Sequence, residues 1–471
     1  MVLEPRLVYR KPLTDKYPQI AHAAEEIARC TKCGLCRAVC PTLIETVSES
    51  QGARGRVSLV EAVLDGRLAL SDVFADRLST CINCKACIEA CPSGVRVDDV
   101  VLAARAELVS RGKFPVLKRL ILRSLLKRGR LLPPVGKTAS LLQRALLKLS
   151  PKGSALRLLL PLVRIDKERS LPVFASRSFR EQVPGRLTPE MPRGSTPVPS
   201  SLETLVPKPR EGKENRLKVA YFVGCASNLI YTNVAFSVVD VLTKLGVEVV
   251  IPPLQGCCGT PIFNAGDLVT AREMARKNIH ALAASDVDAI VVSCASCGLA
   301  LKREYSKILG LETSGLSEKV MDVSEFIVKK VGLDALRAVL SARSPASRVP
   351  TGDGALHREL TVTYHDPCHL KRGQGVRDEP REIIRSIPGV KFVEMQESDR
   401  CCGGGGLYSF THYEMSRAVV ARKVKAIEES GAEIVLTSCP SCMLQLTDAL
   451  TQAGLPVRVM HVMEFLAQNA C

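Results

Sequence analysis

Cysteine is the residue type in this sequence best suited to chemistry, and its 19 copies are grouped. Two runs near the start share the spacing C-x2-C-x2-C-x3-C-P, which is typical of loops that hold 4Fe-4S clusters through thiolates. In such runs three close cysteines bind one cluster and the fourth binds the other. The spacing therefore predicts one cubane cluster on Cys30, Cys33, Cys36 and Cys91, and a second on Cys81, Cys84, Cys87 and Cys40.

Two four-cysteine zinc sites are the alternative, since zinc also accepts four thiolates. We prefer clusters because zinc sites normally draw two ligand pairs from separate places, whereas this run occurs twice with a proline after its fourth cysteine. Lys32, Arg37 and Lys85 lie beside the runs and could raise reduction potentials by offsetting cluster charge. For each of them the interpretation as an ordinary solvated side chain is preferred.

Ten further cysteines form two sets of five in a duplicated C-terminal region. KVAYFVGC, QGCCG, AIVVSCASC and VMDVSEFI match TVTYHDPC, DRCCG, EIVLTSCPSC and VMHVMEFL. Five thiols are one too many for a tetrahedral zinc site or an ordinary cubane, so the adjacent pair indicates an opened-out cluster with a shared sulfur ligand. Gly403 to Gly406 would let the backbone approach it closely. The sets are Cys225, Cys257, Cys258, Cys294 and Cys297, and Cys368, Cys401, Cys402, Cys439 and Cys442.

The elements that must position these cysteines differ along the chain. Residues 52–78, between the first two runs, show helical spacing, while in each C-terminal half β-branched runs alternate with helical stretches and the cysteines follow the strands. We therefore expect a multidomain chain: an all-α, two-cluster ferredoxin-like domain (1–111), a basic, Pro-, Leu- and Arg-rich helical and linker segment (112–216), and two α/β cysteine-rich repeats (217–345 and 346–471). Within the basic segment we expect an extended linker from about residue 174 onward.

The formal charge of +17 is concentrated in residues 112–216, which carry 23 Lys and Arg against 7 Asp and Glu. The leucine-rich basic stretch 113–132 is compatible with a helix on an anionic membrane surface, or with docking to the ferredoxin domain or a partner subunit. Nucleic acid is not an expected partner, because there is no recognition motif and aromatic residues make up only 4%.

We expect a cytoplasmic protein, with peripheral binding to the inner face of the cell membrane as an option. The first residues lack the pattern of a signal peptide, and no apolar run is long enough for a membrane span. In a reducing compartment clustered cysteines are metal ligands rather than disulfides.

A few other side chains are candidates for a functional role. Three side chains surround Cys368 in the sequence: His365, Asp366 and His369. They could relay protons or support a metal site, but a structural hydrogen-bonding role is preferred for them. Glu325 and Glu464 occupy equivalent positions at helix starts, where stabilisation of the helix N-terminus explains them. Cys471 has no motif around it and is expected to be a bystander. No catalytic residue is assigned.

The twice-repeated pattern of C, CCG and CxxC resembles the cysteine-rich "CCG" domain of heterodisulfide reductase catalytic subunits and of the iron–sulfur subunits of glycolate, lactate and anaerobic glycerol-3-phosphate dehydrogenases. A two-cluster ferredoxin domain in front of two such domains resembles the glycolate dehydrogenase iron–sulfur subunit, and the likeness covers most of the chain outside the basic segment. The resemblance implies a non-cubane 4Fe-4S cluster on the five cysteines of each repeat. Zinc, or an empty structural copy, is the alternative for the first repeat.

The resemblance also implies a function as the iron–sulfur electron-transfer subunit of a flavin-dependent 2-hydroxyacid dehydrogenase complex. A partner subunit would carry FAD, and a quinone, a cytochrome or an electron-transferring flavoprotein would accept the electrons. No GxGxxG follows a strand here, so no flavin site is expected on this chain. The alternatives are a heterodisulfide reductase-like catalyst that reduces a disulfide at non-cubane clusters, and a generic electron-transfer module.

Overall fold

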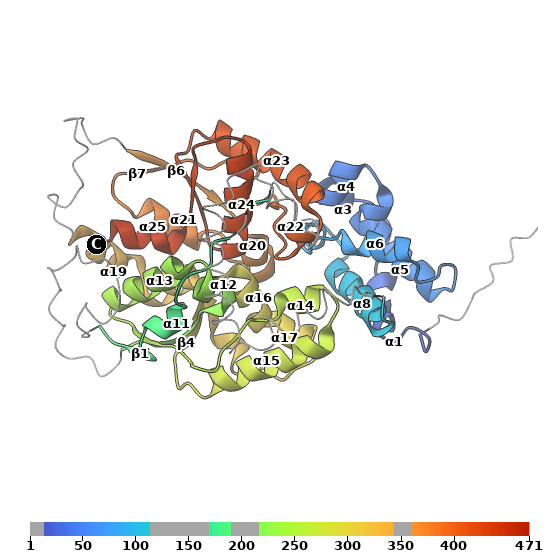
Figure 1. Cartoon of the computed structure of the whole chain (residues 1–471), viewed down its shortest axis with the longest axis horizontal. Helices are drawn as coiled ribbons and strands as arrows, with labels where there is room; N and C mark the ends of the chain where they lie inside the picture. Colours follow the sequence, from blue (N-terminus) through green and yellow to red (C-terminus); the bar gives the residue numbers. More distant parts are fainter. Residues whose placement is uncertain (1–13, 114–168, 171, 190–215, 343–358, 471) are drawn as a thin grey trace, which may run out of the picture. The chain divides into compact units, whose positions relative to one another are not determined.

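The computed structural model of the 471-residue chain describes residues 14–113, 169–170, 172–189, 216–342 and 359–470 (Figure 1). These residues divide into two compact units. The first contains the N-terminal residues together with 261–270, and the second contains the rest of the C-terminal region. No helix within the described ranges is both long and apolar enough to cross a membrane.

The N-terminal unit is built from helices around one apolar core. Val60 and Val100 lie at its centre and are fully buried, because apolar residues recur at helical spacing along the two longest helices. The predicted helical stretch 52–78 is confirmed as two helices, α5 and α6. The helices are α1 (Pro18–Ala21), α2 (Ala24–Ala28), α3 (Cys36–Val39), α4 (Pro41–Thr46), α5 (Ala53–Leu64), α6 (Asp72–Ser79), α7 (Ala86–Glu89) and α8 (Val97–Ser110).

The C-terminal unit contains two sheets with the same internal order, as the duplication predicts. The first sheet runs β1-β3-β2-β4-β5 and the second runs β7-β6-β8-β9. All pairings are parallel except that of β1. The strands are β1 (Arg186–Leu187), β2 (Lys218–Phe222), β3 (Glu248–Val250), β4 (Ala289–Val292), β5 (Val320–Asp322), β6 (Leu360–His365), β7 (Val390–Phe392), β8 (Ile434–Thr437) and β9 (Arg458–His461).

The two repeats share one apolar core. Side chains from both sheets belong to it, and α13 packs on α25 while α16 packs on α20 (Figure 1). The central strands β2, β4, β6 and β8 are mostly buried on both faces, as is usual in parallel sheets. The main helices are α12 (Gly224–Leu229), α13 (Thr232–Lys244), α14 (Thr260–Asn264), α15 (Leu268–Ala283), α16 (Ala295–Leu299), α18 (Val323–Phe326) and α19 (Leu333–Ser341) in the first repeat, and α20 (Cys368–Gln374), α21 (Glu379–Arg385), α22 (Tyr408–Thr411), α23 (Tyr413–Glu429), α24 (Pro440–Gln452) and α25 (Val462–Asn469) in the second.

Part of the basic segment is folded, so the expectation of an extended linker from about residue 174 is wrong for its first residues. Helix α11 (Phe179–Gln182) buries Phe179 edge-on against Tyr221 and Phe236, with ring centroids 6.3 and 4.9 Å away. Strand β1 then pairs antiparallel with β3, with Leu187 opposite Val249. Phe179 and Leu187 are too few and too far apart to give a periodic pattern of apolar residues, so the sequence did not indicate that this proline-rich stretch folds.

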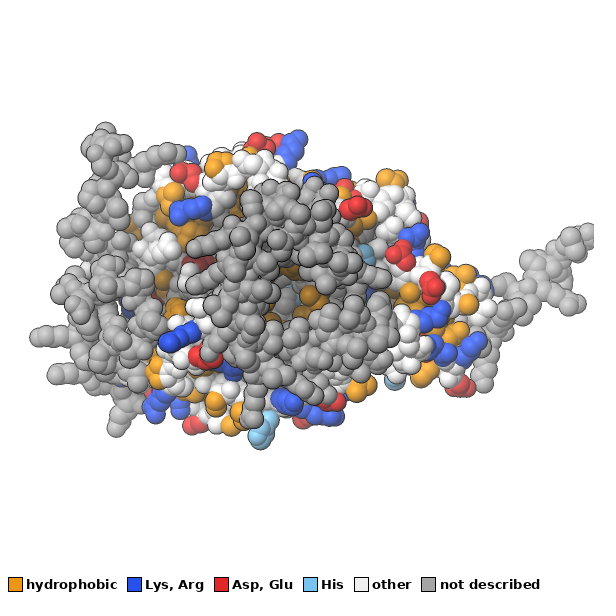
Figure 2. Space-filling view, viewed as in Figure 1, with side chains coloured by type: hydrophobic (Ala, Val, Ile, Leu, Met, Phe, Trp, Pro, Cys, Tyr) orange, Lys and Arg blue, Asp and Glu red, His pale blue; other side chains and the backbone are white. Residues whose placement is uncertain are grey.

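The membrane-surface interpretation of residues 113–132 lies outside the described residues, apart from Lys113. Most of the excess positive charge also falls on residues that are not described. On the face shown in Figure 2, the described basic and acidic side chains are interspersed.

Candidate metal centres

The first ferredoxin-type run and the end of the second run line one pocket of the N-terminal unit. Its walls include the four cysteines predicted for the first cubane, which are Cys30, Cys33, Cys36 and Cys91. Cys87 of the second run lines it as well. The Val95 N–H points at Cys91, with its nitrogen 3.4 Å from Sγ. Backbone N–H groups aimed at sulfur are the usual surroundings of a cluster thiolate. The structure therefore brings these four cysteines to a common space.

The four cysteines predicted for the second cubane also lie together. Cys40 ends α3 and is buried at the start of α4, beside the second run. Burial raises the pKa of the Cys87 thiol, and repulsion from three nearby thiolates raises it further: Cys84, Cys81 and Cys40. A set of buried and partly buried thiols that repel one another when ionised is suited to a bound cation, which removes the repulsion.

Both runs use the same backbone conformation. Lys32 and Asn83, two residues after the first cysteine of each run, have positive φ angles of 58° and 61°. Gly34 and Lys85, two residues farther on, have φ angles of 90° and 62°. Each run thus has two residues in the left-handed conformation, and in the second run neither is glycine. Such repeated strain indicates a loop backbone adapted to bind a ligand.

The three cations beside the runs are not alike. Lys32 and Arg37 are about half exposed and each pairs with a glutamate, in agreement with the solvated interpretation. That interpretation is wrong for Lys85, whose side chain is 2% exposed and pairs with Asp98 at 2.6 Å. The left-handed turn at Lys85 directs its side chain inward onto α8, where Asp98 compensates its charge.

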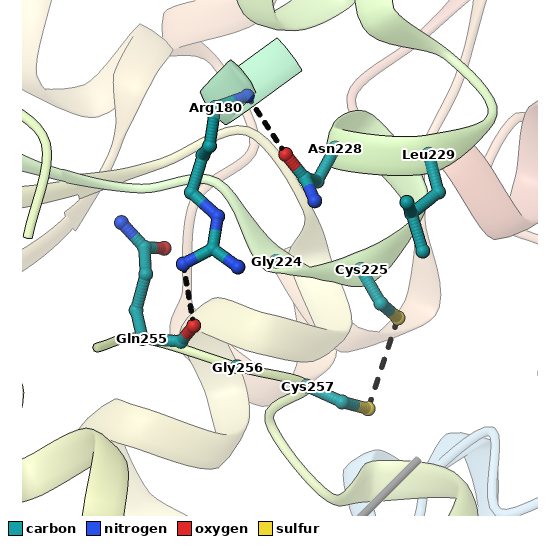
Figure 3. Close-up of a pocket in the computed structure, with 8 residues that line it drawn as sticks. All are labelled: Arg180, Gly224, Cys225, Asn228, Leu229, Gln255, Gly256 and Cys257. Atoms are coloured by element: carbon teal, nitrogen blue, oxygen red, sulfur yellow. Dashed lines mark hydrogen bonds between the residues drawn. The ribbon is translucent and has the colours of Figure 1, made fainter. Parts of the chain in front are cut away.

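In the first repeat, the five cysteines come from three loops at the strand ends. Cys225 lies in the first turn of α12, the vicinal pair follows β3, and the CxxC follows β4. The sulfurs of Cys225 and Cys257 face each other at 3.7 Å beside a small pocket (Figure 3). The pKa of Cys258 is lowered by hydrogen bonds from the Cys257 and Cys297 thiols, so these sulfurs are also in contact. A Cβ on Gly224 would lie 3.0 Å from the Cys297 sulfur, so this glycine keeps the space beside it open.

Side chains from other elements hold the CCG loop of the first repeat, and sequence reasoning missed them. Asn278 of α15 donates to the Cys257 carbonyl at 2.9 Å and accepts from the Gly256 N–H at 2.8 Å. The Tyr305 hydroxyl donates to the Cys258 carbonyl at 2.8 Å. These contacts fix the backbone that carries the vicinal pair, and only the repeat alignment of α15 with α23 could have drawn attention to Asn278.

The second repeat arranges its cysteines in the same way. Cys368 begins α20, Cys401 and Cys402 lie in the loop before α22, Cys439 precedes α24 and Cys442 lies in its first turn. The pKa of Cys402 is lowered by a hydrogen bond from Cys442. Among the glycines, Gly403 is the constrained one: its φ is +76°, its N–H is 3.4 Å from the Cys401 sulfur, and a Cβ would lie 2.7 Å from the Ser416 carbonyl oxygen.

The two sets of five touch each other. The pKa of Cys439 is lowered by hydrogen bonds from Cys294 and Cys442, so the first cysteines of the two CxxC pairs are neighbours. Around this contact, the Ser296 hydroxyl is 3.0 Å from Nδ1 of His369, and the Gln374 amide donates to the Ala295 carbonyl at 2.9 Å. The two repeats therefore bring their cysteines to a shared boundary.

The histidine and acidic candidates divide into two groups. Asp366 forms a buried ion pair with Arg381 at 2.7 Å, and His369 bonds to Ser296, so the preferred structural role is confirmed for both. Glu464 accepts the His461 N–H in a capping box, as expected of a helix start. Glu325 also lies in a first helical turn, and it pairs with two lysines.

His365 differs from this group. It is 1% exposed, and neither ring nitrogen has a nitrogen or oxygen hydrogen-bond partner among the described residues. After the Cys442 thiol and against burial, the imidazole also lowers the pKa of Cys402. One of its ring nitrogens and the sulfurs of Cys402 and Cys442 all lie within 4.8 Å of one another.

The donor sets fit soft metal ions. No described cysteine forms a disulfide bond, and Cys471 lies outside the described residues. Thiolates select iron–sulfur clusters or zinc over hard cations. The five thiols that contact one another in the first repeat exceed what tetrahedral zinc uses, which favours a cluster there.

Comparison with known proteins matches family models to three stretches of the chain. The model of the 4Fe-4S dicluster domain matches residues 26–95, and that of the cysteine-rich domain CCG matches residues 219–302 and 362–447. The probable glycolate oxidase iron–sulfur subunit of Bacillus subtilis (strain 168) is 28% identical over 470 residues, which cover 94% of each chain.

Two other relatives are similar over different lengths. Lactate utilization protein A of Geobacillus kaustophilus (strain HTA426) is 31% identical over 256 residues, which cover 53% of this chain and 98% of the relative. One of the subunits of the dihydromethanophenazine:CoB–CoM heterodisulfide reductase of Methanosarcina barkeri (strain Fusaro) is 25% identical over 484 residues, 98% of each chain.

Proposed function

Because this chain belongs to the family of CCG-domain iron–sulfur subunits that includes the glycolate oxidase iron–sulfur subunit and lactate utilization protein A, we propose that it is the electron-transfer subunit of a flavin-dependent 2-hydroxyacid dehydrogenase complex. A partner subunit carries FAD and oxidises glycolate, lactate or a similar acid. A quinone, a cytochrome or an electron-transferring flavoprotein accepts the electrons. The complex is cytoplasmic, with peripheral binding to the inner face of the cell membrane as the alternative.

The cysteines described above are the proposed ligands. When bound, iron–sulfur clusters accept and release one electron at a time. Cys30, Cys33, Cys36 and Cys91 hold one cubane, and Cys81, Cys84, Cys87 and Cys40 hold the other. Five thiols in each repeat hold a non-cubane cluster: Cys225, Cys257, Cys258, Cys294 and Cys297, and Cys368, Cys401, Cys402, Cys439 and Cys442. Zinc in the first repeat is the alternative that a metal assay decides.

One observation supports this function above the others: predicted cysteine groups bring together members from separate segments of the chain. Cys91 shares a pocket with the first run, Cys40 lies beside the second run, and in the first repeat cysteines from three separate loops are in contact. Such preorganised thiol sets position clusters and exclude water from them.

A heterodisulfide reductase-like function is the second candidate, and a specific contact favours it. Cys294 and Cys439 come from different repeats and share a hydrogen bond, so a substrate at the boundary would be in reach of both centres. The similarity to the heterodisulfide reductase of Methanosarcina barkeri over nearly the whole chain agrees with this candidate.

The test is anaerobic purification from the native host with whatever chains accompany this one. We expect about sixteen iron atoms per chain if all four sites hold four-iron clusters, or about twelve and one zinc if the first repeat holds zinc. We also expect a co-purifying flavoprotein that bleaches with glycolate or lactate. C401S/C402S should lose about four iron atoms, whereas C471S, at the bystander cysteine, should lose none. A cytochrome partner without flavoprotein, together with thiol–disulfide turnover, would refute the dehydrogenase role.

A further inference from the structure

The two repeats differ at buried positions that face their cysteines. Phe222 and His365 are the last residues of the equivalent central strands β2 and β6, three residues before Cys225 and Cys368. Both side chains are 1% exposed. The duplicated scaffold therefore places an apolar ring in the first repeat where it places an imidazole in the second.

The imidazole is in an unusual environment for a core histidine. A buried histidine normally has its ring nitrogens hydrogen-bonded, because leaving them unpaired costs free energy. His365 has no nitrogen or oxygen partner among the described residues, and one ring nitrogen lies within 4.8 Å of the Cys402 and Cys442 sulfurs. The acceptor that would satisfy this ring is therefore at the metal centre.

A second difference between the repeats also places a more polar, hydrogen-bond-donating side chain at the second set of cysteines. Asn278 of α15 corresponds to Lys423 of α23, 145 residues later, which is the offset between Cys294 and Cys439. The Lys423 side chain is buried, and its ammonium donates to the Glu397 carbonyl in the loop that leads to Cys401. Asn278 holds the first CCG loop as a neutral group, whereas Lys423 holds the second as a cation.

Acidic side chains near the second CCG loop already have partners. Asp366 is paired with Arg381, and Asp399 is paired with Lys371 and Arg372. The Lys423 ammonium, by contrast, bonds to a carbonyl oxygen and lies 3.9 Å from the Met395 sulfur. Its charge is therefore available to act on the cysteine set.

We propose that His365 donates a hydrogen bond to the Cys402 thiolate of the second centre, and that His365 and Lys423 together raise the reduction potential of that centre above the value that Phe and Asn at these positions would give. Hydrogen bonds to cluster sulfurs and nearby positive charge stabilise the reduced, more negative state. This inference rests on the proposed function, since it requires a cluster bound through Cys402.

The test is a redox titration of the full chain, purified anaerobically with its clusters and followed by electron paramagnetic resonance. A signal that C402S abolishes belongs to the second centre. H365F and K423N should each shift its midpoint to lower potential, and the double variant should shift it farthest. H280Q and K425N replace an exposed histidine and an exposed lysine, the latter on the same helix as Lys423, and should leave the midpoint unchanged.

Unchanged midpoints in H365F and K423N would overturn the inference while leaving the proposed function intact. Absence of any iron–sulfur signal that depends on Cys402 would instead overturn the proposed function. If H365F does not retain the centre, H365Q decides for the histidine: it keeps an N–H donor, so a retained midpoint supports the hydrogen bond and a lowered one contradicts it. A pulsed-resonance coupling to histidine nitrogen as strong as that of an iron-bound imidazole would replace the hydrogen bond with direct ligation.

Discussion

Removal of the Arg169 side chain should destabilise the C-terminal unit more than any exposed substitution in the same basic segment. The guanidinium is 1% exposed and donates to Asp448 and Gln445 of α24, both at 2.8 Å, and to the Ser409 hydroxyl of α22 at 3.2 Å. It also lies over two aromatic rings, those of Phe410 and Tyr413. These contacts connect the basic segment to the two helices that flank the loop of four glycines.

The magnitude follows from what R169A would leave behind. Asp448 would remain buried as an uncompensated charge, and breaking a buried pair in this way costs about 3–5 kcal/mol. Asp448 would keep hydrogen bonds from the Ser170 N–H at 2.7 Å and the Tyr413 hydroxyl at 3.1 Å, so we expect the lower end, about 3 kcal/mol. For a unit of this size that loss corresponds to roughly 6–12 °C in Tm. R169K, which keeps the charge but loses the planar fork, should lose about 1–2 kcal/mol.

The assay is anaerobic calorimetry of the cluster-loaded chain at one scan rate, with iron content measured in parallel. R186A is the matched control, because Arg186 lies in the same segment and its pair with Glu248 is at the surface, where such pairs contribute about 0–1 kcal/mol. R169A should also lose iron from the second repeat, since Gln445 lies directly beside Gly404. If R169A lowers Tm no more than R186A does, the buried pair does not stabilise the unit and the reasoning is refuted.

Two further predictions follow from the backbone and from pH. G403A should lose iron from the second repeat, because its Cβ would lie 2.7 Å from the Ser416 carbonyl oxygen. G406A is the control: Gly406 has φ +65° and open space around it, so this variant should lose only about 1 kcal/mol of stability and keep its iron. Equal iron loss in both variants would contradict this prediction. Burial raises the pKa of Asp322 to about 7 from its ordinary value of 3.8, so the folded state binds this proton more tightly and the free energy of unfolding falls as pH rises from about 4 to about 7. D322N keeps an acceptor for the Ser324 N–H and should flatten this decline in a denaturation series; an unchanged slope would refute the assignment.

The sequence predicted the cysteine groups because metal binding imposes short, fixed spacings. The spacing of Cys33 and Cys36 after Cys30 matches what the size of a 4Fe-4S cluster requires, and the same spacing recurs in the second run. The α/β layering was predictable for a related reason: a parallel strand buried on both faces is a nearly continuous run of apolar and β-branched residues, as AIVV of β4 and IVLT of β8 are.

The sequence did not predict the contacts that reach a site from a distant element. Arg169 lies in a basic, proline-rich segment where nothing distinguishes it from its solvated neighbours, and its partners on α24 follow it by 276 and 279 residues. Lys85 was misjudged for the same reason, since only the packing of α8 shows that Asp98 meets it. Composition describes an average environment, whereas burial of one charge depends on a single partner brought close by the fold.

The duplication clarifies which features hold a centre and which distinguish one centre from the other. All five cysteines match between the repeats, and so does the strand order, so the scaffold and its thiols follow from one ancestral pattern. Asp322 and His461 occupy the same position at the end of the last strand of each repeat, yet burial raises the pKa of Asp322 to about 7 and lowers that of His461 to about 4. Burial therefore favours the uncharged form of both side chains, one as an acid and the other as a base. The difference between Phe222 and His365 is of another kind, because the histidine adds a polar group beside the thiols. The difference between Asp322 and His461 keeps both side chains uncharged and so preserves the fold. The difference between Phe222 and His365 adds a hydrogen-bond donor beside the sulfurs and so changes the chemistry available to the second repeat.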